Sequence, residues 1–137
     1  MAKRKFKIKF RIPSYGAPRN DWRKRIYKAA RTEMRARRVT YRSDDRLAVE
    51  VVLYLEGAAV GFHDVDNRLK DVLDALQARM GGPKAARRHW PLIPNDNQIF
   101  RVAVIKMLPP PQSHGLGHVT VTKHRKYAIE HLRDWGS

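Results

Sequence analysis

The chain has 137 residues and a mass of 15.9 kDa, a length typical of one domain. It contains no cysteine, which excludes a disulfide scaffold and a cysteine-ligated zinc site. The apolar runs are too short for a transmembrane helix, and the basic N-terminal segment lacks the continuous apolar stretch of a secretory signal. We therefore expect a soluble protein of the cell interior with no segment that spans a membrane.

Positive charge dominates the composition. The 29 Lys and Arg residues against 13 Asp and Glu residues give a net charge of +16 and a pI near 10.8. Residues 1–46 carry 17 of the basic and only 4 of the acidic side chains. Such a balance favours a polyanionic partner, of which nucleic acid is the commonest. A well-solvated basic surface without a partner remains an alternative, as does an anionic membrane, although no basic stretch has the bulky apolar face that membrane binding requires.

The N-terminal third is predicted to contain a strand and a helix. Apolar and basic residues alternate strictly over residues 5–12, which is the period of a half-buried strand. Asn20 or Asp21 is expected to cap a helix that runs to about Arg38, with its apolar residues at helical spacing. Its arginines either form a solvated face or contact phosphates, and their density favours phosphate contact. The candidates are Arg23, Arg31, Arg35 and Arg38.

The remaining patterns predict three more strands and two more helices. They cover residues 46–56, 98–107 and 118–122 for the strands, and residues 66–80 and 124–135 for the helices. In the third strand, the residues expected to be buried are Ile99, Val102, Val104 and Ile105. Because strands and helices are mixed without repeats or a linker, we expect one small α+β domain with helices packed on a mixed sheet.

The carboxylates of the central region give the first specific signal. Between residues 57 and 123 there are five Asp residues and no Glu, and two of the five, Asp64 and Asp66, are two residues apart. If this segment is extended, both side chains point the same way and can reach one ion. Ordinary helix capping explains Asp66 but not the second Asp. Hard oxygen ligands in a basic chain suggest Mg²⁺ and phosphodiester chemistry.

The order of these motifs resembles the RusA family of Holliday junction resolvases. The resemblance rests on Asp64-Val65-Asp66-Asn67-Arg68-Leu69-Lys70, then on Asp74-Ala75-Leu76, and finally on Asp96 followed by Asn97-Gln98 before a strand. It covers residues 64–106, while the rest of the chain agrees only in general layout. The segment between Leu76 and Asp96 is longer than the family pattern, and residues 122–137 look like a helical extension.

The resemblance implies a RusA-like domain over residues 1–137 that resolves four-way DNA junctions as a homodimer with Mg²⁺, or Mn²⁺ in its place. It implies that Asp64, Asp66 and Asp96 bind the metal and that Lys70 is the essential basic residue beside them. Asp74 is expected either to support the metal-binding residues or to be structural. His63 could be a ligand but is more often a hydrogen-bonded neighbour in such a position. Further DNA contacts are expected from the basic residues Arg68, Arg87 and Arg88.

Two other functions remain open from the sequence. One is a basic nucleic-acid-binding module without catalysis, whose aspartates are caps and turn residues. The other is a metal-dependent nuclease for other branched or flapped DNA. For the resolvase, the expected roles are DNA recombination and repair. The expected location is the cytoplasm, in association with the nucleoid, and proteins of this kind are often encoded by phages or prophages.

Overall fold

The computed structural model describes residues 5–15, 18–55, 65–80 and 90–124. Several sequence predictions lie outside these ranges. They concern His63, Asp64, Arg87, Arg88 and the terminal helix expected over residues 124–135, of which only His124 is described.

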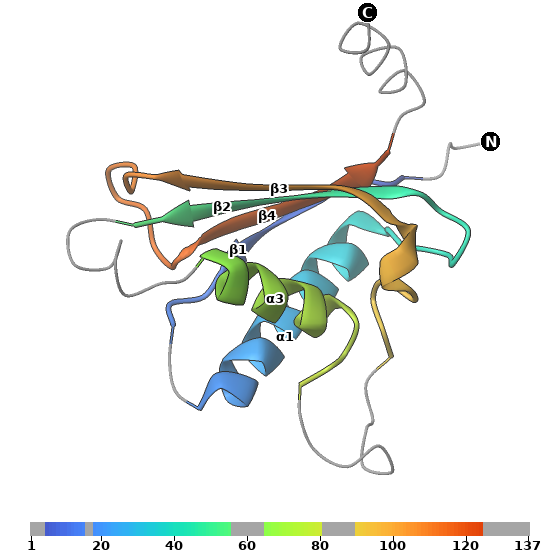
Figure 1. Cartoon of the computed structure of the whole chain (residues 1–137), viewed down its shortest axis with the longest axis horizontal. Helices are drawn as coiled ribbons and strands as arrows, with labels where there is room; N and C mark the ends of the chain where they lie inside the picture. Colours follow the sequence, from blue (N-terminus) through green and yellow to red (C-terminus); the bar gives the residue numbers. More distant parts are fainter. Residues whose placement is uncertain (1–4, 16–17, 56–64, 81–89, 125–137) are drawn as a thin grey trace, which may run out of the picture.

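Four strands and two α-helices make up the described fold (Figure 1). Their order along the chain is β1 (Ile8–Ile12), α1 (Arg19–Arg37), β2 (Leu47–Tyr54), α3 (Val65–Leu76), the short 3-10 helix η2 (Asp96–Gln98), β3 (Ile99–Met107) and β4 (Gly117–Lys123). The strands form one sheet in the order β1-β4-β2-β3. Strand β2 is parallel to β3 and antiparallel to β4, which is also antiparallel to β1. The expected α+β fold with a mixed sheet is confirmed.

Both α-helices cover the same face of the sheet (Figure 1), and this arrangement divides the strand residues into two sets. Alternate residues of β1, β2 and β4 point toward the helices and are buried, because successive strand side chains face opposite ways. They meet the buried face of α1 and the apolar residues of α3. The largest fully buried side chains of this core include Trp22, Ile26, Ile12, Leu53 and Leu76. The other sheet face carries no described helix, and we call it the open face.

Helix α1 follows the predicted periodicity, but its ends differ from the prediction. It buries Trp22, Ile26, Ala30 and Met34 among others, as the spacing indicates. The N-cap position is Pro18, whose side chain makes no capping hydrogen bond, rather than Asn20 or Asp21. Proline is tolerated there because its missing N–H would have no helical partner anyway, and its fixed φ suits the entry to a helix.

Strand β3 is more exposed than the sequence suggests. Of the four residues expected to be buried, Val102 and Ile105 are 43% and 45% exposed, so that expectation is wrong for them. The physical reason is position: β3 is an edge strand that pairs only with β2 in the described sheet, and Ile105 also points to the open face. Hydrophobic composition predicts a strand but does not distinguish an edge from the centre of a sheet.

Two glycines allow the segment before β4 to lie close against β1 and β2. Gly115 has φ +85°, and a Cβ there would collide with the Ile12 carbonyl oxygen. Gly117 has φ +150°, and a Cβ there would collide with the Val52 carbonyl oxygen. Side chains other than hydrogen would therefore clash with backbone at both positions. The close approach brings the β3–β4 connection to one end of the open face.

Within the described residues, no helix combines the length and the apolar character needed to cross a bilayer.

Candidate functional site

The start of α3 presents two of the predicted site residues to solvent. The helix begins at Val65, one residue earlier than expected, so Asp66 lies in its first turn and Lys70 one turn later. Both side chains are exposed. Residues four apart share one stripe of a helix, so the carboxylate and the ammonium project from the same side of α3. A carboxylate in the first turn is also stabilised by the helix dipole.

A buried carboxylate, which the sequence did not single out, joins α3 to α1. The Asp71 side chain has no exposed surface, and its Oδ1 atom accepts hydrogen bonds from Arg19 Nε and Arg23 Nε at 2.5 and 2.9 Å. Its Oδ2 atom lies 3.3 Å from an Nη atom of Arg68. A buried charge is expensive unless it is paired, and here three guanidinium groups surround one carboxylate.

Aromatic rings hold the third arginine of this network in place. The Arg68 guanidinium lies 4.6 Å from the centre of the Tyr15 ring and 5.3 Å from that of Trp22. The two rings also meet edge to face, and Trp22 Nε1 donates to the Pro13 carbonyl oxygen at 2.9 Å. Arg68 is thus fixed between α3, α1 and the segment that follows β1, with only 8% of its surface exposed.

Two of the arginines that we predicted to contact DNA are instead engaged by other side chains of the protein. Arg23 pairs with Asp71 and also with Asp74, at 3.3 Å, and its side chain is mostly buried. Arg68 is buried on Asp71 and the aromatic rings. The structure thus gives both arginines a role in fixing α3 against α1. Asp74 takes part in the same network, which agrees with the structural role expected for it.

Asp96 lies in a different part of the molecule from Asp66. It is exposed in η2, where Asn95 and Gln98 form a capping box. Gln98 Nε2 donates to the carbonyl oxygens of Arg42 and Asp45, which fixes η2 beside the start of β2. Figure 1 shows η2 at this end of the sheet, whereas α3 begins toward the end where β2 finishes.

Helix α3 itself separates the two carboxylates. The main-chain N–H groups of Leu92 and Ile93, which lead to η2, donate to the carbonyl oxygen of Leu76 at the last residue of α3. The first turn of α3 is about 15 Å away from that point, at about 1.5 Å per residue. The structure therefore does not bring Asp66 and Asp96 of one chain together. Within the described ranges, no three Asp, Glu or His side chains form a group that could hold a metal ion.

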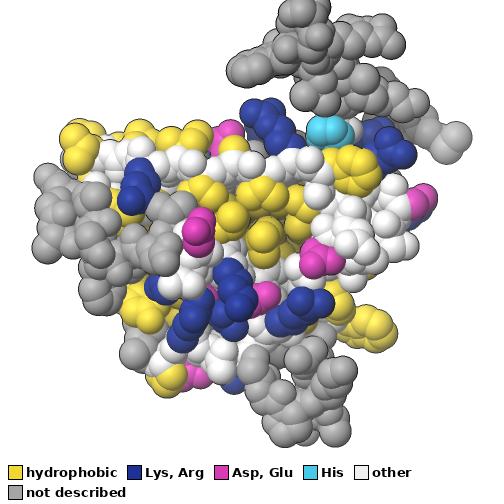
Figure 2. Space-filling view, in the orientation of Figure 1, with side chains coloured by type: hydrophobic (Ala, Val, Ile, Leu, Met, Phe, Trp, Pro, Cys, Tyr) yellow, Lys and Arg dark blue, Asp and Glu magenta, His cyan; other side chains and the backbone are white. Residues whose placement is uncertain are grey.

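The other three arginines of α1 that we predicted to contact DNA are accessible on the surface of the protein. Arg31, Arg35 and Arg38 are all exposed, and their spacing puts them on one side of the helix end. Arg38 adopts the left-handed conformation, with φ 56°, and its N–H donates to the Arg35 carbonyl oxygen to end the helix. In Figure 2, dark-blue side chains lie over α3, with magenta carboxylate atoms among them.

The open face carries a second basic group that sequence reasoning did not assign to any site. Lys9 and Arg11 of β1, and Lys7 just before the strand, are exposed on this face, and His118 lies on the neighbouring strand opposite Arg11. The alternating basic residues of residues 5–12 were the available signal. What the pattern could not show is which residues of other strands would stand beside them.

No protein-family model matches this chain, and no curated protein is significantly similar to it.

Proposed function

We propose that the protein is a Mg²⁺-dependent endonuclease that resolves four-way DNA junctions by hydrolysing phosphodiester bonds. The observation that carries the proposal is the start of α3, where Asp66 and Lys70 are exposed on one side of a helix. The Asp71 network joins that helix to α1, and the whole chain has a net charge of +16. A carboxylate and a lysine on a well-anchored helix in a basic protein suit metal-assisted attack on a phosphate.

The donor set at this helix suits a hard cation only in part. Asp66 offers an exposed carboxylate, and Asp64 precedes it by two residues but lies outside the described ranges. We assign the metal to this pair, because carboxylate oxygens are the ligands that Mg²⁺ prefers. When bound, the ion would activate water and neutralise charge on the phosphate.

Basic residues near the carboxylates would offset the repulsion between these carboxylates and the DNA backbone. Carboxylates repel the DNA backbone, so other groups must hold it close. Lys70 contributes a fixed positive charge one turn from Asp66, where it can stabilise charge that develops on the scissile phosphate. The exposed arginines at the end of α1 add sequence-independent contacts to the backbone.

A non-catalytic nucleic-acid-binding module is the second candidate function. One observation favours it: Asp71 and Asp74, two of the five aspartates of the central region, form ion pairs that join α3 to α1. On this alternative the basic surfaces bind nucleic acid and Asp66 only stabilises the start of α3. A nuclease that cuts other branched DNA forms a third alternative.

The deciding experiment is cleavage of a synthetic mobile four-way junction. The same strands are presented as a junction, a flap, a fork and a linear duplex, each with Mg²⁺, with Mn²⁺ and with EDTA. We expect cleavage of the junction far above that of the duplex, and only with a divalent ion. Binding without cleavage would establish the non-catalytic module, and preference for flaps or forks would establish the third alternative. Cleavage in EDTA would exclude the proposed chemistry.

The proposal includes a homodimer, because resolution of a junction requires two symmetric cuts. A twofold axis relates two such sites naturally. Since Asp66 and Asp96 lie toward opposite ends of α3 in one chain, Asp96 can serve the ion at Asp66 only if a second copy contributes it. A site that uses both aspartates would therefore be shared between two subunits.

A further inference from the structure

The open face of the sheet contains a pocket in which several hydrogen-bond donors meet. It has a volume of about 300 Å³, and its walls come from β1, β2, β4 and the β3–β4 connection. The polar side chains that line it are Lys9, Arg11, Tyr54, Ser113, His114 and His118. Among the residues that the structure describes, no carboxylate lines it. Such a set of donors without an acid fits an anion.

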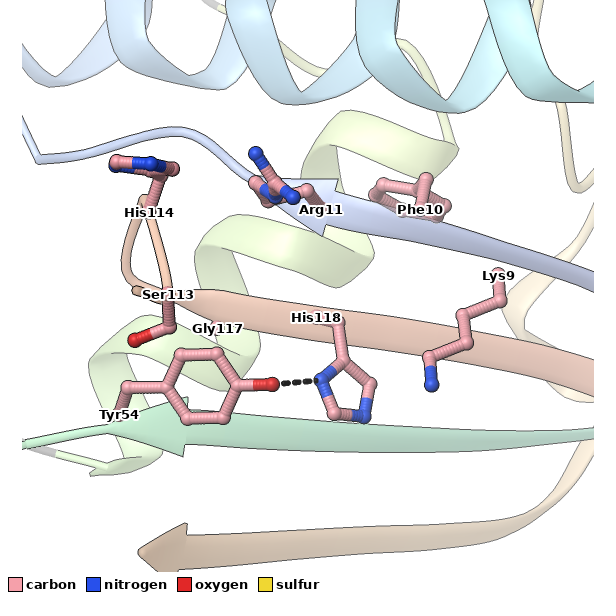
Figure 3. Close-up of a pocket in the computed structure, with 8 residues that line it drawn as sticks. All are labelled: Lys9, Phe10, Arg11, Tyr54, Ser113, His114, Gly117 and His118. Atoms are coloured by element: carbon pink, nitrogen blue, oxygen red, sulfur yellow. Dashed lines mark hydrogen bonds between the residues drawn. The ribbon is translucent and has the colours of Figure 1, made fainter. Parts of the chain in front are cut away.

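His118 is the fixed centre of this pocket. Figure 3 shows its ring between Tyr54 and Lys9, with Arg11 on the adjacent strand. The Tyr54 hydroxyl and His118 Nδ1 are 2.7 Å apart and share a hydrogen bond. If the hydroxyl donates, Nε2 carries the ring proton, and if Nδ1 donates, the hydroxyl proton is free. In either tautomer one donor remains for a ligand.

The electrostatics of the pocket also favour an anion. Burial, and then the charge of Lys9, lower the pKa of His118 below its ordinary value, while Glu50 opposes the effect. A ligand with negative charge would offset the Lys9 charge and stabilise the imidazolium. Phosphate oxygens are strong acceptors for Lys and Arg groups of this kind.

The side chains around the pocket indicate which kind of molecule the bound anionic group belongs to. A second hollow on the open face is lined by Lys7, Arg101 and the threonines of β4, and its acid among the described residues is Glu50. On the β3 side of the same face, Ile105 and Met107 are exposed beside Val52 and Tyr54. Basic groups from β1 and from Arg101, with exposed apolar side chains of β3 on the same face, suit a strand whose phosphates and bases lie side by side.

We propose that the pocket around His118 binds a phosphate group, and that this phosphate belongs to the backbone of a nucleic-acid strand lying across the open face. The site is on the side of the sheet opposite α1 and α3 (Figure 1). It is separate from the carboxylates of α3 and does not depend on cleavage. For a nuclease, it would add a second surface that holds a branch of the substrate.

The first test is an NMR titration of His118 in metal-free buffer, with two ligands in separate arms. One arm uses inorganic phosphate, and the other uses oligo(dT) without terminal phosphates. We expect both to raise the pKa of His118, with oligo(dT) acting at lower concentration. Other groups around the ring are Lys9, Arg11, Glu50, Tyr54 and His114, so the titration is repeated with His114→Gln to assign the signal. Binding should tighten as the pH falls through the window between the free and the bound pKa of His118.

The second test compares two double variants of equal net charge. Lys9→Gln with Arg11→Gln removes the two cations of the pocket, and Arg79→Gln with Lys106→Gln removes two exposed cations elsewhere. Affinity for oligo(dT) is measured by fluorescence anisotropy over a range of salt concentrations. The quantity compared is the slope of the logarithm of the affinity against the logarithm of the salt concentration. We expect the first pair to make this slope shallower by about 0.7 for each phosphate that the protein no longer neutralises, and the control pair to change it less.

The outcomes separate the parts of the proposal. A shift of His118 with inorganic phosphate but not with oligo(dT) would overturn the assignment to nucleic acid. No shift with either ligand would overturn the phosphate site altogether. Equal salt dependence for the two double variants would show that nucleic acid does not cross this face. Tyr54→Phe, which keeps the ring but removes the hydroxyl, should weaken phosphate binding without unfolding the sheet.

Discussion

At the scale of a single residue, Asp71 is a carboxylate that serves the structure of the protein rather than a reaction. It is the one fully buried acid of the described residues, and arginines from α1 and α3 converge on it. Because Arg23 and Arg68 are mostly buried, their positive charges lie close together at low cost only while a negative charge lies between them. Removal of that charge leaves them facing one another.

Asp71→Asn is predicted to destabilise the fold by about 3–5 kcal/mol, the range seen when one partner of a buried ion pair is removed. Asparagine keeps the size of the side chain, so the change isolates the charge. Denaturant unfolding measures the loss, and Asp44→Asn, at an exposed position, is the matched control and should stay within about 0.5 kcal/mol. A value for Asp71→Asn equal to that of the control would show that the network contributes nothing.

Asp66→Asn separates binding from chemistry at the proposed site. The variant loses a metal-binding charge but also a source of repulsion toward phosphate, so we expect cleavage to disappear while junction affinity stays equal or becomes tighter. Single-turnover cleavage and a gel shift on the same junction measure the two effects. Parent-like cleavage by this variant would remove Asp66 from the site.

Lys70→Ala is predicted to lower the cleavage rate by orders of magnitude with only a modest loss of affinity, because binding is spread over many other cations. If Lys70 were only a surface partner of its helix neighbours, its loss would cost about 0.3–0.5 kcal/mol of stability and leave the rate unchanged. Single-turnover rates, with an unfolding curve beside them, distinguish the two roles.

The sequence distinguished these residues only in part. The spacing of Asp66 and Lys70 predicted one stripe of a helix, and the structure places both on α3. Asp71 shows the limit of such reasoning, because it follows Lys70 in the sequence like another polar residue of the helix, and its partners on α1 are 48 and 52 residues away. Hydrophobic periodicity describes neighbours along a helix, and it does not identify contacts between helices.

At the scale of elements, the strands and helices could be predicted because each has a clear period. The alternation in β1 and the apolar stripe of α1 both depend on local geometry, and both are found where expected. The exposure of β3 and the cap of α1 could not be predicted, because they depend on which strands lie at the edge and on the path of the chain before the helix. The His118 pocket needs three strands in register, which no local pattern contains.

The end of α1 carries a prediction that belongs to the element as a whole. We expect a shallower salt dependence of junction binding when Arg31, Arg35 and Arg38 are neutralised together. The slope of log affinity against log salt concentration should decrease in magnitude by up to about 0.9 for each phosphate that these arginines neutralise. Substitution by Gln, Gln and Asn keeps helix propensity and suits the left-handed position at residue 38. The control removes three exposed cations elsewhere, at Arg42, Arg79 and Lys106. An unchanged slope for the α1 variant would mean that this side of the helix faces only solvent.

At the scale of the whole molecule, the basic surfaces lie on both sides of the sheet. The α1 arginines belong to the helical layer, and Lys9, Arg11 and His118 belong to the open face. A linear duplex cannot lie on both faces of so small a domain without bending, whereas the arms of a branched substrate leave the branch point in different directions. The branched substrate of the proposed function could contact both basic surfaces in this way.

The position of Asp96 leads to a prediction about two copies of the chain. Asp66 and Asp96 lie toward opposite ends of α3 in one chain, so a site that needs both must take them from different subunits. Asp66→Asn and Asp96→Asn should each be inactive alone. When the two variants are mixed and allowed to exchange subunits, half of the dimers combine them, and one of the two sites in each combines two unaltered aspartates. About one quarter of the sites should then regain activity, measured as nicking of a junction strand.

The same mixture distinguishes the alternatives for Asp96. If both aspartates served one site within a chain, every site in the mixed dimer would carry one substitution, and nicking would stay absent. If Asp96 had no part in the site, Asp96→Asn would cut the junction at the parent rate before any mixing. A double variant with both substitutions, mixed with the unaltered protein, provides the matched control. Its mixed dimers contain one altered aspartate in each shared site, so they should be inactive if the aspartates come from different subunits and half active if they come from one.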